Sequence, residues 1–422
     1  MVEATTKSYA FPVPNDSPRD VLTEILRDGA RKMLADAIDD EVRLYLRQRS
    51  ELVNQNGHQQ VVRNGYLPER TILTGLGPIA VNQPRVRDRR SPQEREKFTS
   101  SILPPYLRKS KSMEELLPWL YLKGISTSDF GEALHALVGE NAKGLSATTI
   151  TRLKSIWETE YKDFSKRSLA NKHYVYVWAD GIYFNVRLED AGNDRQCILV
   201  LMGATPDGKK ELIAISDGYR ESMQSWRELL LDCKSRGLGE CGGDPKLAIG
   251  DGGLGFWASM EQVWPSTLTQ RCWVHKTANI LNKMPKGIQG KAKSMLHDIW
   301  MAQTRADANK AFDLFVEMFG PKYPKAVECL HKDRDVLLTF YDFPAEHWSH
   351  LRTTNPIEST FATVRLRTDK TKGCGSRTAT LTMVFKLAQS AEKHWRALNG
   401  STLIADLIAG VQFVDGIKKD AA

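Results

Sequence analysis

The stretch from Asn171 to His275 constrains the fold most, because strand patterns and helix patterns follow one another along it in a definite order. Its first half consists of β-rich runs at Tyr174 to Ala179, Ile182 to Leu188, Cys197 to Ala204 and Lys210 to Ser216. Its second half shows a helix, a strand, a helix and a strand at Trp226 to Gly237, Leu247 to Gly250, Phe256 to Val263 and Leu268 to Val274.

Hairpin-linked strands followed by alternating helices and strands are typical of a ribonuclease H-like fold, a mixed sheet with helices on its faces. We therefore expect residues 171–275 to form an α/β core of this class. Helical spacing then replaces strand patterns. Residues 276–350 predict an all-helical insertion, and residues 351–422 predict C-terminal helices that complete the core and carry Glu358.

Three acidic residues stand at the ends of predicted elements in this core. Asp180 and Asp251 each follow a predicted strand, and Glu358 lies in the first turn of a helix that Asn355 opens. Two-metal phosphoryl transfer requires carboxylates that converge on hard cations about 3.5–4 Å apart. The three acids are therefore candidate catalytic residues and metal ligands.

Each acid also has a purely structural interpretation. Asp180-Gly181 is a hairpin-turn signal, and Asp251-Gly252 fits a loop in which the aspartate bonds to the backbone. Asn355 to Glu358 fits an N-cap, a proline at the first helical position and a capping-box acid. A basic run behind Glu358 favours contact with a phosphodiester backbone. Its candidate DNA-binding residues are Arg365, Arg367, Lys370 and Lys372.

Cys272 and His275 form a Cys-x-x-His pair at the end of the last predicted strand. A zinc site needs four ligands, and no second pair occurs at a suitable spacing, so packing or positioning near the pocket is the favoured interpretation. Trp300 and Trp348, in the predicted insertion, are the tryptophans to test for stacking on a splayed base, although tryptophan is more often a core residue.

Charge is concentrated between Val61 and Lys111, where eleven basic residues face four acidic ones, an excess of +7. Short apolar runs and glycine–proline punctuation predict a small β element and an arginine-rich loop over residues 61–112. Such a loop suits phosphate binding, and the alternative is a solvated basic surface. The candidate DNA-binding residues here are Arg63, Arg85, Arg87, Arg89 and Arg90.

Helices are expected on both sides of this basic element. Residues 1–60 contain an amphipathic pattern from Asp16 to Leu52, which predicts a helix or helix pair that packs on the chain or on a second copy. Residues 113–170 predict three short helices in a helix-turn-helix pattern. The last of them offers Thr149, Arg152 and Lys154 to a DNA major groove, unless the bundle is only structural.

Composition excludes several classes of protein. The chain has 422 residues, 59 lysines and arginines against 51 acids, and a formal charge of +8, which favours a polyanionic partner. Its six cysteines lack regular spacing and predict reduced thiols, while no apolar run is long enough for a membrane span. With no leader pattern at the start, we expect a cytoplasmic protein.

Several short motifs together are more specific than any one of them. In chain order they are Arg63 to Tyr66, Pro84 to Arg87, Asp180-Gly181, Ser222 to Trp226 with Lys234 to Gly237, Asp251-Gly252, Gln270 to Lys276 and Thr353 to Ser359. Across nearly its whole length, the chain resembles the insertion-sequence transposases of the bacterial Mutator-like family.

The resemblance implies a DDE transposase whose catalytic acids are Asp180, Asp251 and Glu358. It implies two Mg²⁺ ions, with Mn²⁺ as an alternative, and hydrolysis of a phosphodiester at the element's terminal inverted repeat. The freed 3′-hydroxyl then attacks another strand. Cys272 and His275 belong to the family signature, with a role that stays open. The implied partners are double-stranded DNA, as terminal repeats and as target, and a second subunit, because work on two distant ends needs at least a homodimer.

Other functions fit parts of the pattern. A metal-dependent nuclease or resolvase could use the same acids without joining ends. A sequence-specific DNA-binding regulator could carry a ribonuclease H-like domain without chemistry. A carboxylate-pair hydrolase acting on sugars does not explain the basic windows.

Overall fold

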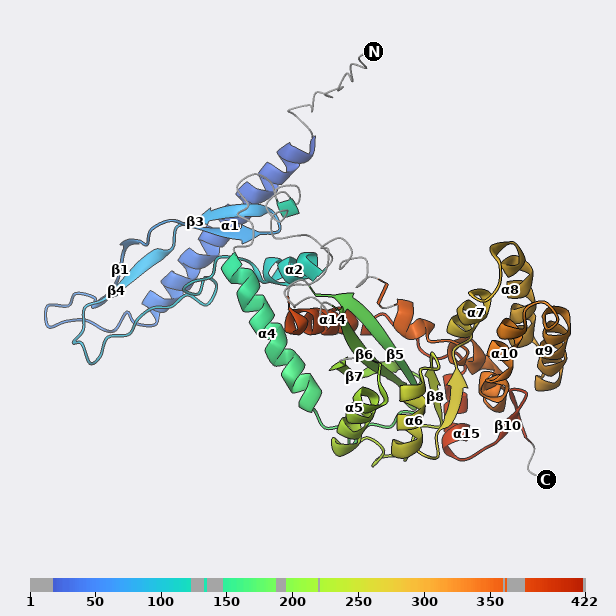
Figure 1. The fold of residues 1–422 in the computed structure, drawn as a ribbon. Coiled ribbons are helices and arrows are strands. Elements are labelled where there is room, and N and C mark those ends of the chain that lie inside the picture. Colours follow the sequence, from blue (N-terminus) through green and yellow to red (C-terminus); the bar gives the residue numbers. More distant parts are fainter. Residues whose placement is uncertain are drawn as a thin grey trace, which may run out of the picture. The chain divides into compact units, whose positions relative to one another are not determined.

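The computed structural model describes residues 18–122, 133–134, 147–186, 195–218, 221–359, 361–362 and 376–419 (Figure 1). The described residues divide into two compact units. The N-terminal unit contains residues up to Tyr121 together with 133–134 and 147–150, and the C-terminal unit contains Leu122 and the described residues from Thr151 onward. The finer domain boundaries expected from the sequence stay a prediction.

The N-terminal unit is a long helix packed on two small antiparallel strand pairs. The helix α1 (Pro18–Arg47) is continuous, so the single-helix alternative is confirmed over this range. Strands β1 (Val61–Tyr66) and β4 (Pro84–Asp88) pair antiparallel, as do β2 (Arg70–Thr74) and β3 (Gly77–Val81). A small core of Ile38, Ile72, Ile79, Val81 and Leu103 holds them together.

The predicted β element is therefore confirmed, with one correction. Arg85 and Arg87 lie on β4 and not in a loop, because that segment pairs with β1 through Arg87 opposite Val62. Two helices follow, α2 (Lys111–Leu122) and α4 (Ala147–Lys166). The middle helix of the expected helix-turn-helix falls mostly outside the described residues, and α4 is longer than expected.

A five-stranded mixed sheet forms the centre of the C-terminal unit. Its strands are β5 (Tyr176–Asn185), β6 (Arg195–Ala204), β7 (Lys210–Gly218), β8 (Leu247–Gly250) and β9 (Leu268–Arg271). They are ordered β7-β6-β5-β8-β9, antiparallel from β7 to β5 and parallel from β5 to β9 (Figure 1). The α/β class is confirmed, and so is the predicted succession of strands and helices along the chain, except that the first two predicted strands are one strand, β5.

One expected turn is absent. Residues 174–179 and 182–188 were predicted as two strands, but β5 passes through Asp180 and Gly181 without a break. Asp180 pairs with Val200 and Gly181 with Leu199 on β6, so long-range pairing prevails over the local turn signal. The hairpin-turn interpretation of Asp180-Gly181 is wrong.

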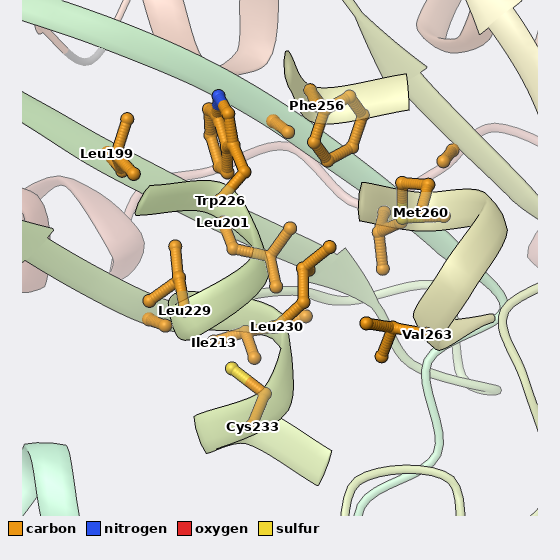
Figure 2. Packing of buried hydrophobic residues seen from close by; sticks show 14 of the residues in the cluster. Leu199, Leu201, Ile213, Trp226, Leu229, Leu230, Cys233, Phe256, Met260 and Val263 are labelled. Carbon is orange, nitrogen blue, oxygen red and sulfur yellow. The ribbon is translucent and has the colours of Figure 1, made fainter. Parts of the chain in front are cut away.

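Two helices, α5 (Met223–Ser235) and α6 (Leu254–Val263), cover one face of the sheet. Figure 2 shows Trp226, Leu229 and Leu230 of α5 and Met260 of α6 over Leu201 of the sheet. Full burial of such a side chain contributes roughly 1.5–3 kcal/mol. The core therefore fixes the starts of α5 and α6 against the sheet edge where β8 ends.

The expected helical insertion is confirmed in its secondary structure. It contains α7 (Trp273–Leu281), α8 (Lys286–Met301), α9 (Arg305–Phe319), α10 (Pro324–His331), α11 (Arg334–Leu337), η1 (Thr339–Asp342), η2 (Ala345–His347) and α12 (Trp348–Leu351). The last predicted strand ends at Arg271, earlier than expected, because α7 begins at Trp273. Arg271 and Lys276 both form salt bridges with Asp333, which tie the α10–α11 connection to the end of β9.

The C-terminal segment packs back on the sheet. Residues 355–359 and 361–362 are helical, and α14 (Arg377–Glu392) contacts β7 with Val384 and Phe385 buried. Small elements follow, namely η3 (Ser401–Leu403), α15 (Ile404–Ile408), β10 (Phe413–Val414) and β11 (Ile417–Lys418). Within the described residues, every helix is too short or too polar to cross a lipid bilayer.

Candidate active site

Asp180 lies in the interior of β5, two positions beyond the last residue of β5 that pairs with β8. The residue is only 5% exposed. Burial is the largest cause that raises the pKa of Asp180 to about 7; His275 opposes this rise, and the negative charges of Asp251 and Glu358 add to it. Asp180 therefore shares an electrostatic environment with both other predicted acids.

Asp251 is the first residue after β8 and is half-buried. Its Oδ1 atom accepts a hydrogen bond of 2.8 Å from the backbone N–H of Gly253. The expected hydrogen bond to the loop backbone is therefore present. The charge of Asp251 also raises the pKa of Asp180. The structural and functional interpretations of Asp251 are thus compatible.

Glu358 is held at the start of the helical segment 355–359. Its backbone N–H donates to the carbonyl oxygen of Thr354 over 3.1 Å, and its Oε1 atom accepts from the Thr354 hydroxyl over 3.2 Å. The predicted capping box needs a correction. The backbone N–H of Asn355 donates to the Thr353 hydroxyl, and the helix includes Asn355, so the Glu358 carboxylate does not cap that N–H.

Thr354 joins Glu358 to the Cys-x-x-His pair. Cys272 is the N-cap residue of α7, and its Sγ atom accepts from the Thr354 N–H at 3.3 Å and the Thr354 hydroxyl at 3.4 Å. The Nδ1 atom of His275 lies 3.4 Å from the same hydroxyl, and its Nε2 atom lies 3.3 Å from Oε1 of Glu358. The pair was expected at the end of the last strand. It lies instead at the start of helix α7.

The pair is polarised. Hydrogen bonding to Cys272 raises the pKa of His275 to about 9, despite burial, with further support from Asp180 and Glu358. Burial raises the pKa of Cys272, but hydrogen bonds from His275 and Thr354 outweigh it and leave that pKa below its ordinary value. Both shifts act in the direction of a thiolate beside an imidazolium.

The closest ligand group in the described part of the chain is not the predicted triad. Each of the residues Cys272, His275 and Glu358 offers one ligand atom, and these three atoms lie within 4.8 Å of one another. Asp180 and Asp251 stand outside that group, although Asp180 interacts electrostatically with both Asp251 and Glu358. The metal-ligand role of the three acids stays a prediction.

The sequence analysis did not identify Glu221 as a candidate residue. Glu221, just before α5, lies against Gly181, and burial raises its pKa to about 8 with further contributions from Asp251 and Asp180. Its only sequence signal is an acid directly before the Ser222 N-cap, which is common at helix starts. Nothing local in the sequence indicates that it faces the candidate site.

The predicted DNA-binding residues differ in their exposure and in the bonds that their side chains already form. Arg85, Arg87 and Arg89 are exposed, and Arg63 bonds to Asp39 and to the Tyr66 hydroxyl. Arg90 is held by Asp88 over 2.7 Å, and this bond lowers the pKa of Asp88 well below its ordinary value.

The remaining candidates lie elsewhere. Arg152 is exposed and Lys154 half-buried on α4, which also carries Thr149. Arg365, Arg367, Lys370 and Lys372 lie outside the described residues.

The two tryptophans singled out for base stacking are engaged within the fold. Trp348 is buried against Phe340 and Tyr341 and donates its Nε1–H to the carbonyl oxygen of Phe343. Trp300 is half-buried and packs on Trp273. Trp348 is a core residue.

Of the six cysteines, Cys197, Cys233, Cys241, Cys272 and Cys329 are free thiols, and Cys374 lies outside the described residues.

Comparison with known proteins identifies relatives along most of the chain. A family model described as "Transposase, Mutator family" matches residues 4–397. The chain is 52% identical over 304 residues to a transposase for insertion sequence element IS6120 from Mycolicibacterium smegmatis, covering 72% of this chain and 92% of that protein.

Two further relatives extend this result. The chain is 52% identical over 286 residues to a transposase for insertion sequence element IST2 from Acidithiobacillus ferrooxidans, covering 68% of this chain and 95% of the relative. It is 25% identical over 368 residues to a transposase for IS256 in transposon Tn4001 from Staphylococcus aureus, covering 85% and 88% of the two chains.

Proposed function

Because the chain belongs to the Mutator family of transposases, we propose that it binds the terminal inverted repeats of an insertion sequence, cleaves DNA there and joins the freed 3′-hydroxyl to target DNA. The observation that carries this proposal is the electrostatic coupling of Asp180 to Asp251 and Glu358, three acids from distant parts of the chain. Such coupling of a buried carboxylate to neighbouring charged groups is typical of an active site.

We assign the fold of the C-terminal unit to the ribonuclease H-like class. The strand order β7-β6-β5-β8-β9, with an antiparallel half and a parallel half, supports this assignment. Asp180 on β5 and Asp251 directly after β8 lie where these two adjacent strands cease to pair. The sheet therefore brings them to one edge, and the helix of Glu358 contributes the third acid.

The donor chemistry of this edge suits Mg²⁺. Carboxylate oxygens are the ligands that magnesium prefers, and their mutual repulsion is offset by a divalent cation. Among the described residues, no salt bridge joins a lysine or arginine to Asp180 or Asp251. We propose that Asp180, Asp251 and Glu358 hold two Mg²⁺ ions. When bound, the metal supplies activation of the attacking oxygen and stabilisation of the leaving oxygen.

The residues around the acids prepare this site. The single hydroxyl proton of Thr354 is shared between Oε1 of Glu358 and Sγ of Cys272, and the backbone N–H of Thr354 also donates to Cys272. His275, with its pKa raised to about 9, holds a proton next to Oε1 of Glu358. We propose that the Cys-x-x-His pair is a positioning device for Glu358.

The N-terminal unit is proposed to bind the DNA ends. Arg85, Arg87 and Arg89 are exposed near one end of a small β element, where they can contact phosphates. Arg90 forms a salt bridge with Asp88, and we do not propose it as a DNA contact.

A homodimer is proposed because two DNA ends must be handled together. Helix α1 exposes a series of large apolar side chains, which are Val21, Leu22, Ile25, Leu26 and Met33. In the expected dimer these side chains would be covered by the second copy.

A strand-transfer assay tests the function. A precut terminal-repeat duplex and a second duplex are incubated with the protein and Mg²⁺, and we expect a joined product. A nuclease or resolvase would cleave without joining, and a DNA-binding regulator would do neither. Absence of joined product with a bound, precut repeat end would contradict the proposal.

A further inference from the structure

A cavity of about 630 Å³ lies beside Glu358 in the C-terminal unit. Its walls come from the start of β7, from α12, from the helical segment 355–359 and from the residues that follow α14. The lining residues that matter here are Lys210, His350, Glu358, His394, Trp395 and Arg396. Pockets that bind small molecules typically measure about 300–1,000 Å³, so this cavity can hold a ligand the size of one nucleotide.

The cavity lies on the same face of the sheet as Asp180. Trp178 and Asp180 are two positions apart on β5, so their side chains point to one face, opposite to the face that α5 and α6 cover. The Trp178 Nε1–H donates to the carbonyl oxygen of His350 over 3.0 Å. The Nζ atom of Lys210 lies 5.8 Å from the centre of the Trp178 ring. A ligand in the cavity would therefore lie beside the proposed site of DNA cleavage.

Lys210 is a buried cation in the wall of this cavity, and the residue is only 8% exposed. Its Nζ atom donates to the carbonyl oxygen of Arg396 over 3.0 Å and lies 3.1 Å from Nδ1 of His350. Among the residues that the structure describes, Lys210 forms no salt bridge with a carboxylate, whereas its neighbour Lys209 is paired with Asp207. An ammonium group carries three hydrogens, so Lys210 keeps a third donor for a ligand.

Neither partner of Lys210 carries a negative charge. Burial, and then the charge of Lys210, lower the pKa of His350 to about 4, so the ring is neutral at neutral pH. Burial lowers the pKa of Lys210 to about 8, which leaves most of this side chain charged at the same pH. A buried charge is costly unless an opposite charge and hydrogen bonds compensate it. An anion at Nζ would supply the missing opposite charge.

The neighbouring side chains indicate which anion fits. Arg396 is exposed at the cavity, and its guanidinium group can bind two phosphate oxygens at once. Trp395, the residue before it, is half-buried and adds an aromatic ring to the same wall. Basic groups combined with an aromatic side chain on which a base can stack are typical of sites for single-stranded nucleic acid. The cavity therefore suits a nucleotide, with a phosphate and a base.

We propose that this cavity holds one nucleotide of the DNA strand that is cut, with its phosphate on Lys210 and its base against Trp395. The inference rests on the proposed cleavage of DNA at the site of Glu358. It goes beyond that function because it assigns a substrate subsite in the C-terminal unit, separate from the phosphate contacts proposed for β4.

Photo-cross-linking of the full-length protein tests the proposal without any substitution. A precut terminal-repeat duplex carries 5-iodouracil at one position at a time near the cut end. The complex is irradiated without Mg²⁺, so that no strand is cut, and mass spectrometry identifies the attached peptide. We expect a cross-link at His394 or Trp395 from a position close to the cut end. Cross-links that never include residues 394–396, from any position, would overturn the proposal.

Lys210→Met tests the phosphate contact, because it removes the charge and keeps a long side chain. The slope of log affinity for the duplex against log salt should decrease by about 0.7–0.9, the value for one phosphate. The cross-link at residues 394–396 should weaken about tenfold. The melting temperature should not fall, because a buried charge is removed. An unchanged slope together with an unchanged cross-link would refute the role of Lys210.

The matched control is Lys209→Met, since this neighbouring lysine is exposed and already paired with Asp207. It should give the wild-type slope and the wild-type cross-link. Lys210→Arg restores a positive charge and should recover most of the slope. A loss in Lys209→Met as large as in Lys210→Met would show a general effect of charge and would contradict the subsite.

Two further measurements separate the possible sources of the nucleotide and the two proposals. Calorimetry with deoxyadenosine monophosphate detects a free nucleotide in the cavity. Binding that Lys210→Met abolishes, with no DNA cross-link at residues 394–396, would overturn the assignment to DNA. Strand transfer is measured on the same protein. Joined product without the cross-link refutes only this inference, whereas the cross-link without joined product supports the subsite and contradicts the proposed joining reaction.

Discussion

Thr354 is bound to Cys272 through both its backbone N–H, at 3.3 Å, and its hydroxyl, at 3.4 Å. The same hydroxyl lies 3.2 Å from Oε1 of Glu358. A fully buried threonine thus connects a thiol at the start of α7 with a predicted catalytic carboxylate. The connection supports the proposed role of the Cys-x-x-His pair in placing Glu358.

Thr354→Val should leave the backbone bond and remove the hydroxyl. Because Glu358 then loses a partner on its carboxylate, we expect DNA cleavage to slow by about tenfold or more, the equivalent of about 1.4 kcal/mol. Binding of end DNA should not change. Thr354→Ser keeps the hydroxyl and should retain most of the activity. Equal rates for the valine and serine variants would show that the hydroxyl does not position Glu358.

Cys272→Ala should lower the pKa of His275. Hydrogen bonding to Cys272 is the largest cause of its rise to about 9, so the value should move toward the ordinary 6.5. Nuclear magnetic resonance titration of the histidine ring protons measures this, with His275→Asn identifying the signal. Cys329→Ala, at a half-buried thiol on α10, is the control and should leave the titration unchanged. An unaltered pKa in Cys272→Ala would refute the polarised pair.

The contribution of Asp180 to the stability of the metal-free protein should fall with rising pH. The pKa of Asp180 is raised from 3.8 to about 7 on folding, so its contribution is fully present below about 3.8 and lost as pH rises through about 7. The difference is of the order of a few kcal/mol. Urea unfolding at several pH values should show a smaller decline over this window in Asp180→Asn than in the wild type. A decline of equal size in both proteins would contradict the assignment.

The exposed arginines of β4 should contribute to the salt dependence of DNA binding. In the variant with both Arg85→Ala and Arg87→Ala, the slope of log affinity against log salt should decrease by about 0.9 for each phosphate that the protein no longer neutralises. Fluorescence anisotropy at a series of salt concentrations measures the slope. Arg31→Ala, an exposed arginine paired with Asp28 on α1, should keep the wild-type slope. A double variant with that same slope would place the DNA-binding surface elsewhere.

The dimer prediction depends on the exposed apolar residues of α1. Ile25 is 63% exposed, and Ile25→Glu should shift the protein toward monomer because a charge would be buried at the contact. Light scattering after size exclusion, with and without end DNA, measures the mass. Ala35→Glu adds the same charge at another exposed position of α1 and should leave the mass unchanged. An Ile25→Glu protein with wild-type mass would exclude this contact.

Strands and helices of the core could be predicted because burial leaves a periodic trace in the sequence. The apolar run that became β6 and the stripe of Trp226, Leu229, Leu230 and Cys233 on α5 are examples. Asp180-Gly181 misled the turn prediction because its conformation depends on pairing with β6, about twenty residues away. No local pattern carries that pairing.

The site shows the same limit. Asp180, Asp251 and Glu358 could be proposed from element ends and from motif resemblance, but Glu221 could not. Its place depends on the space left by Gly181 and on contact between the starts of α5 and α6. Gly181 lies 40 positions before Glu221, and Gly255, at the start of α6, lies 34 positions after it. Such contacts appear only once the chain is folded.

The most direct measurement of the central claim is Mg²⁺-dependent cleavage of a terminal-repeat duplex by the wild type and by Asp180→Asn, with end binding measured in parallel. The account predicts that the variant binds the duplex as tightly as the wild type and yields no cleaved product. Cleavage by Asp180→Asn at the wild-type rate would show that the chemistry does not reside in these acids.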